Sequence, residues 1–92
     1  MSPSSDLDVE RSVRLPAGVA LHARPAGALV RAAAAFAAEV FVGFGGRRAN
    51  AKSILDVLAL GAEDGSELVI SASGEDAAAA VEHLALLVPE LA

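Results

Sequence analysis

The chain has 92 residues, which is enough for one compact domain and too few for two independent cores. Its net charge of −5 and its aromatic content of 3% give no basic, aromatic-rich surface of the kind that binds nucleic acid. Because cysteine is absent and only two histidines occur, disulfides and thiolate metal sites are excluded, and we expect neither a metal nor a cofactor.

Residues 1–8 form an acidic segment rich in serine, which we expect to be a flexible tail before a single domain over residues 9–92. The segment lacks the basic and apolar regions of a secretory signal. The most apolar stretch, residues 26–44, is interrupted by Arg31 and Glu39 and is too polar to span a membrane. We therefore predict a cytoplasmic protein with no membrane insertion.

The first predicted elements are a strand and a helix. Apolar and polar residues alternate over residues 9–15, a period of two that is typical of a strand. From Pro25 to Phe36 apolar side chains recur every three or four residues, which predicts an amphipathic helix ending near Ala38. Pro25 lies inside the first turn, where its missing N–H costs nothing, so the helix start is well defined.

A hairpin follows this helix. Residues 39–44 alternate again, and Gly45 and Gly46 can adopt the positive φ of a tight turn. Residues 47–51 can then return as a short partner strand.

The second half of the chain predicts a short helix, a strand and a last helix, over residues 52–60, 67–73 and 74–88. Ser53 is a suitable N-cap for the short helix, and Gly61 stands just beyond its end. Pro89 closes the last helix. The order strand, helix, strand, strand, helix, strand, helix predicts an α+β open-faced sandwich, in which a four-stranded antiparallel sheet carries three helices on one face.

His22 is the main candidate for chemistry, because it lies just before the first turn of a helix. The first N–H groups of a helix have no intrahelical acceptor and lie at the positive end of its dipole, so an anion bound to the imidazole would meet free donors. Neutral imidazole is a nucleophile near pH 7, and Arg24 could bring a guanidinium to phosphoryl oxygens. The alternative is that His22 is only a cap or an exposed polar residue.

Two motifs weigh against that alternative. "LHARPAGALV" and, later in the chain, "ANAKSILDVLALGA" resemble the two signatures of HPr, the histidine-containing phosphocarrier family of the bacterial sugar phosphotransferase system. The resemblance extends from Val9 to Val88 and includes the order of elements. It implies that His22 is phosphorylated on Nδ1 by enzyme I, which is charged by phosphoenolpyruvate, and passes the phosphoryl group to IIA domains of sugar permeases. Arg24 and the backbone of Ala23 and Arg24 would then hold the phosphate.

The resemblance also implies a regulatory site and a partner surface. Ser53 corresponds to the serine that a dedicated kinase phosphorylates in some bacteria. Its role as the N-cap of the short helix is sufficient by itself to explain it and is the preferred interpretation, and the two roles can hold at once. A serine kinase and a transcription regulator would be further partners. The implied docking residues are Ala23, Gly27, Arg31, Lys52, Ile54, Leu55 and Leu58.

Three residues depart from the family pattern. Ala20 replaces a glycine, which would strain the loop before His22 if that position needed positive φ. Asp56 puts a negative charge beside the docking residues, and Ala34 replaces a lysine. These changes would alter partner choice and leave the chemistry of His22 unchanged.

Other titratable residues have simpler explanations. We interpret His83 as a surface or half-buried residue of the last helix. Solvation and helix dipoles account for the acidic pairs at residues 63–64 and 75–76.

Three functions stay open on the sequence alone. The first is a phosphocarrier, which is not a stand-alone enzyme and which we expect to be a monomer. The second is a regulatory HPr homologue, or a carrier in a specialised relay such as the phosphoenolpyruvate-dependent dihydroxyacetone kinase system. The third is a protein-interaction domain that carries no phosphate.

Overall fold

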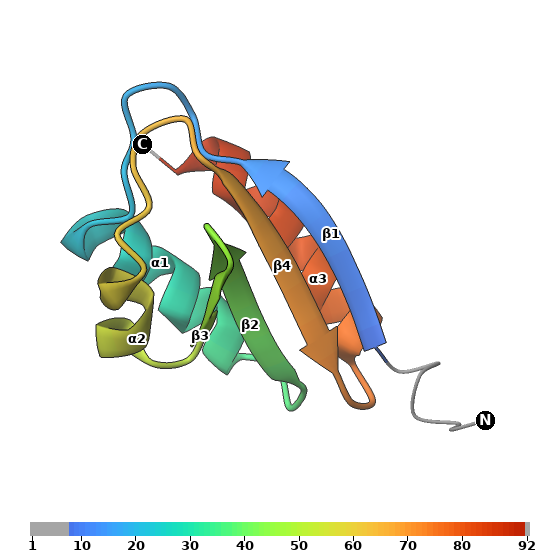
Figure 1. Cartoon of the computed structure of the whole chain (residues 1–92). Helices are drawn as coiled ribbons and strands as arrows, with labels where there is room; N and C mark the ends of the chain where they lie inside the picture. The colour runs from blue at the N-terminus through green and yellow to red at the C-terminus, as the bar shows by residue number, and fades with distance from the viewer. Residues whose placement is uncertain (1–7, 92) are drawn as a thin grey trace.

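The computed structural model describes residues 8–91, so almost all of the predicted tail lies outside the described residues. Its elements follow the predicted order (Figure 1). The strands are β1 (Asp8–Arg14), β2 (Glu39–Phe44), β3 (Arg47–Asn50) and β4 (Glu67–Ser73), and the helices are α1 (Ala23–Ala34), α2 (Ile54–Ala59), α3 (Ala77–Leu87) and a final 3-10 turn, η2 (Val88–Glu90).

The four strands form one antiparallel sheet in the order β1-β4-β2-β3. Strand β4 pairs with β1 on one side and with β2 on the other, so that Ile70 lies opposite both Arg11 and Val42. The period of two in β4 is confirmed, since Leu68, Ile70 and Ala72 are buried and the residues between them are more exposed. The predicted antiparallel sheet is therefore confirmed.

The helices form the second layer of the molecule. Helix α3 packs on β1 and β4, and α1 lies beside it, while α2 contacts α1 and β3 at the edge of the sheet (Figure 1). Leu29 from α1, Ile70 from β4 and Leu84 from α3 are fully buried between the layers. Small side chains such as Ala26 and Ala80 are also fully buried there, which lets the helices approach closely. The predicted open-faced sandwich is confirmed.

The prediction that the first helix runs to Ala38 is wrong, because α1 ends at Ala34. The apolar pattern continues, but the backbone N–H groups of Ala37 and Ala38 donate to the carboxylate of Asp76 at 2.9 Å and 2.8 Å. Asp76 precedes α3 and is distant in sequence from α1. A side chain from another element therefore takes the donors that would have continued the helix.

Helix α2 is held at both ends. The Ser53 Oγ accepts a hydrogen bond from the N–H of Asp56 at 3.3 Å, which confirms the predicted N-cap. At the other end, the guanidinium of Arg47 donates to the carbonyl oxygen of Ala59 at 2.6 Å, and Gly61 has a φ of +67°. The positive charge of Arg47 also interacts favourably with the negative, C-terminal end of the helix dipole.

Helix α3 ends differently from its prediction. Its α-helical part stops at Leu87, and Pro89 lies inside the 3-10 turn that follows instead of closing the helix. Its inward face is apolar, and Val81, Leu84 and Val88 are all fully buried.

Candidate functional site

His22 occupies the N-cap position of α1, with extended backbone angles of φ −97° and ψ −166°. Its carbonyl oxygen accepts the first helical hydrogen bond, from the N–H of Ala26 at 2.9 Å. The imidazole is exposed and makes no capping hydrogen bond. The side chain is therefore free for chemistry at a backbone position that begins the helix.

The first turn of α1 provides donors next to this imidazole. Within residues 8–91, no acceptor is found for the N–H groups of Ala23 and Arg24. Pro25, the third helical residue, has no N–H to satisfy and is buried, which anchors the start of the helix. The two free N–H groups and the helix dipole together favour an anion at His22.

Arg24 and Arg31 lie on one side of α1, because they are separated by about two helical turns. Both side chains are exposed. A Cβ atom placed on Gly27 would lie 3.4 Å from the Nη1 atom of Arg31, so this guanidinium folds back over Gly27 toward the start of the helix. Ala23, Gly27 and both arginines are thus all residues of α1, the helix that begins at His22.

The loop before His22 is unstrained at Ala20. Within residues 8–91, positive φ occurs only at glycines, and Gly18 has such an angle, at +83°. The departure from glycine at position 20 therefore has no cost in backbone strain. The N–H of His22 donates to the carbonyl oxygen of Ala20 at 2.9 Å, which makes a tight turn directly before the helix.

Helix α2 presents an apolar patch beside α1. Ile54 and Leu55 are 38% and 75% exposed, and Leu58 is half-buried against the core. Val57 is fully buried on the opposite side of the short helix. The apolar residues of α2 are therefore not all buried. Asp56, which follows Leu55 in the chain, is also exposed.

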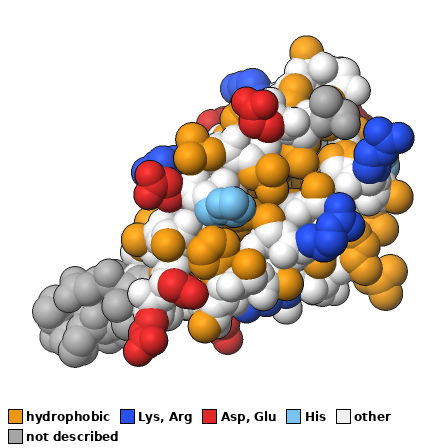
Figure 2. All heavy atoms as spheres, turned by 180° about the vertical axis from the view of Figure 1, so that it is seen from behind, with side chains coloured by type: hydrophobic (Ala, Val, Ile, Leu, Met, Phe, Trp, Pro, Cys, Tyr) orange, Lys and Arg blue, Asp and Glu red, His pale blue; other side chains and the backbone are white. Residues whose placement is uncertain are grey.

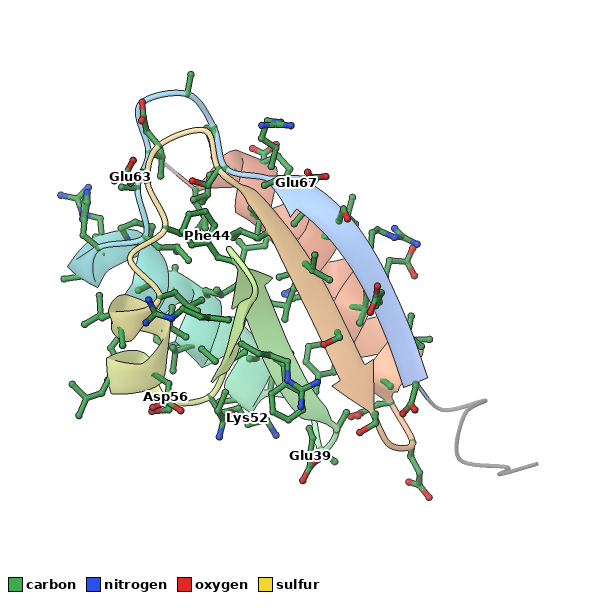
Figure 3. The ribbon with its side chains drawn as sticks, in the orientation of Figure 1. Glu39, Phe44, Lys52, Asp56, Glu63 and Glu67 are labelled. Carbon is green, nitrogen blue, oxygen red and sulfur yellow. The ribbon has the colours of Figure 1, made fainter. Side chains whose placement is uncertain are left out.

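Lys52 lies away from His22. Its ammonium donates to the carbonyl oxygen of Phe36 at 2.6 Å, just beyond the last turn of α1. Helix α1 is about 18 Å long, so this contact is at the opposite end of the helix from the imidazole. In Figure 3, Lys52 lies near the lower end of the molecule, whereas the chain enters α1 at the upper left.

Three further residues have structural partners. Ser53 is half-buried, and its Oγ is engaged with the N–H of Asp56. His83 is exposed on α3, and its ring lies 5.7 Å from that of Phe36, which agrees with its interpretation as a helix surface residue. Asp64 is more than a solvated acid, because its Oδ2 accepts from the N–H of Gly18 at 3.2 Å. No local pattern signals this contact.

Basic and acidic side chains are unevenly distributed over the surface of the molecule. Figure 2 shows the side of the molecule that carries the helices, where hydrophobic side chains cover much of the surface. To the right in this view, on the side where α1 lies, the basic side chains that are visible stand apart from the acidic ones. This local basic area lies on a chain whose net charge is −5.

Comparison with known proteins points to one family. A family model described as the PTS HPr component phosphorylation site matches residues 9–90. The chain is 44% identical over 81 residues to the phosphocarrier protein HPr of Haemophilus influenzae, covering 88% of this chain and 95% of that protein.

Solved structures give the same result. The crystal structure of a phosphocarrier protein HPr from Bacillus anthracis matches with a TM-score of 0.83 and 37% identity, covering 88% of this chain and 96% of that one. An HPr dimer from Thermoanaerobacter tengcongensis matches with a TM-score of 0.69 and 33% identity, covering 83% and 87%. Within residues 8–91, no helix has the length and apolar character needed to cross a membrane.

Proposed function

Because this chain belongs to the HPr family of phosphocarriers of the phosphotransferase system, we propose that His22 accepts a phosphoryl group from enzyme I and passes it to IIA domains of sugar permeases. The observation that carries this proposal is the imidazole at the start of α1, which is exposed and makes no capping hydrogen bond. Its ring nitrogen attacks phosphorus in line as the bond between phosphorus and the donor's nitrogen breaks. The free N–H groups of Ala23 and Arg24 and the Arg24 guanidinium stabilise the phosphoryl oxygens.

Labelling tests this proposal directly. We expect phosphoenolpyruvate, magnesium and enzyme I to place one acid-labile, base-stable phosphate on the protein, and His22→Ala to abolish it. His83→Ala is the matched control and keeps the label, since His83 lies on α3 beside Phe36. Absence of label on the unmodified chain, with an enzyme I that labels another HPr, contradicts the proposal.

Asp56 favours a second candidate function. Its exposed carboxylate follows Leu55 in α2, the helix that carries the apolar patch, and would repel an acidic partner surface. A regulatory HPr homologue, or a carrier for a phosphoenolpyruvate-dependent dihydroxyacetone kinase, would use different partners. Transfer from the labelled protein to a IIA domain, compared with transfer to that kinase's phosphoryl-accepting subunit, separates the two.

The remaining parts of the proposal concern regulation by phosphorylation, location in the cell and oligomeric state. We propose that Ser53 is the target of a serine kinase, which incubation with that kinase and ATP tests, with Ser53→Ala as control.

We propose that the protein acts in the cytoplasm as a monomer. Sedimentation at micromolar concentration tests the monomer, since a similar HPr has been described as a dimer.

A further inference from the structure

The loop that leads into His22 lies beside the segment that follows α2 (Figure 1). Two backbone hydrogen bonds join them near the ends of the loop. The N–H of Leu15 donates to the carbonyl oxygen of Ser66 at 2.9 Å, and the N–H of Leu21 donates to that of Ala62 at 3.0 Å. The residue before His22 is therefore tied to the residues that follow α2.

Asp64 holds the middle of the same loop. Its carboxylate accepts from the N–H of Gly18 at 3.2 Å, between the two backbone contacts. Gly18 has positive φ, so the chain turns at this residue. Arg14 adds a second side-chain contact, since its Nη1 donates to the carbonyl oxygen of Gly65 at 2.9 Å.

These contacts connect the loop before His22 with the segment that follows α2, the helix that carries the apolar patch. Leu21 and Ala62 are 3% and 4% exposed, so their hydrogen bond is sheltered from water. The segment containing Asp64 comes directly after α2, which carries Leu55, and Arg47 fixes the end of that helix. The position of His22 relative to α2 therefore depends on how firmly the loop is held.

We propose that Asp64 is a positioning residue for phosphoryl transfer at His22, acting through the N–H of Gly18. The proposal rests on the proposed function of His22. In-line transfer requires the imidazole to stand in one place relative to the bound donor, and small displacements reduce rates strongly. Loosening the loop should therefore lower the turnover of transfer more than it weakens docking.

A pair of substitutions isolates the hydrogen bond. Asp64→Ala and Asp64→Asn both remove the charge, but only alanine removes the acceptor for Gly18. We expect Asp64→Ala to lower the maximal rate of phosphoryl transfer from enzyme I by about tenfold with little change in KM. Asp64→Asn should keep a rate near that of the unmodified protein.

Glu63→Ala is the matched control for charge. Glu63 is the neighbouring exposed acid (Figure 3), and the hydrogen bond from the N–H of Gly18 goes to Asp64 instead. Amide exchange gives a second readout, because the Gly18 amide should exchange faster in Asp64→Ala than in Asp64→Asn. Thermal unfolding confirms that each variant is folded at the assay temperature.

Each outcome decides the question. Equal rates for Asp64→Ala and Asp64→Asn overturn the positioning role, and an equal loss in Glu63→Ala attributes the effect to charge and also overturns it. If the unmodified protein takes no phosphate, the proposed function fails and the positioning role fails with it. If the unmodified protein is phosphorylated and Asp64→Ala reacts equally fast, only the positioning role fails.

Discussion

Asp76 joins two elements through a single side chain. Its carboxylate accepts hydrogen bonds from the N–H groups of Ala37 and Ala38, at the turn between α1 and β2. The bond from Ala37 is the main cause that lowers the pKa of Asp76 below its ordinary value of 3.8, and the bond from Ala38 and the nearby Lys52 ammonium add to it. The folded structure therefore stabilises the ionised carboxylate of Asp76 relative to the unfolded chain.

The sign of the pH dependence follows from this lowered pKa. The contribution of Asp76 is fully present above the pKa of the unfolded chain, and it is lost as pH falls through the lower pKa of the folded state. We expect Asp76→Asn to have a lower Tm than the unmodified protein at pH 7. In strong acid, where Asp76 is protonated, the two Tm values should become equal. Thermal unfolding between pH 7 and pH 2 measures this. Glu75→Gln, the adjacent exposed acid, should show no such change, and an unchanged Tm for Asp76→Asn at pH 7 would contradict the role.

At the scale of elements, α2 divides its side chains between the core and the surface. A helix of six residues is too short to be stable alone, so it depends on its caps and on packing. Ser53 and Arg47 hold its ends, and Val57 is buried beneath it. Leu55 instead faces solvent on the side of the apolar patch.

Two alanine substitutions in α2 should therefore affect different properties, one the stability of the fold and the other the affinity for a partner. Val57→Ala removes fully buried methyl groups and should lower the free energy of unfolding by about 2 kcal/mol. Leu55→Ala should change that free energy by less than about 0.5 kcal/mol and should raise the Kd for enzyme I. Urea unfolding and titration calorimetry measure the two quantities. A large stability loss in Leu55→Ala would show that this residue belongs to the core.

At the scale of the whole molecule, a net negative chain carries a local basic surface. Four of the seven basic residues have partners inside the protein: Arg14, Arg47 and Lys52 donate to backbone carbonyl groups, and Arg48 stacks on Phe41 at 4.1 Å. Arg24, in the first turn beside His22, and Arg31, in the last turn, are exposed on one side of α1. These two charges would attract a partner with an acidic surface before contact.

The association rate with enzyme I should therefore depend on salt. We expect the rate to fall between about 10 mM and about 150 mM salt, as the Debye length shrinks from about 30 Å to about 8 Å. Arg31→Ala should reduce both the rate and its salt dependence. Arg11→Ala, an exposed arginine on edge strand β1, is the control and should change neither. Stopped-flow mixing provides the rates, and a salt-independent rate would contradict steering.

The site was partly predictable, because its central features are local. A histidine, an arginine and a proline at the start of an apolar helical pattern define a helix N-terminus, and the structure places His22 there with free N–H groups next to it. The position of the residues proposed for docking was less predictable. Lys52 follows β3 closely in sequence, yet its ammonium binds Phe36 at the far end of α1, because its reach depends on how α1 packs on the sheet.

The sequence by itself determined the order of the elements, the buried faces of β4 and α3 and the cap of α2, because each depends on residues within a few positions of one another. Only the tertiary structure decided where α1 ends and how the loop before His22 is held. Both depend on carboxylates from distant segments, since Asp76 is 39 residues from Ala37 and Asp64 is 46 residues from Gly18. Periodicity and spacing describe neighbours along the chain, whereas such contacts form only when the sheet brings separate segments together.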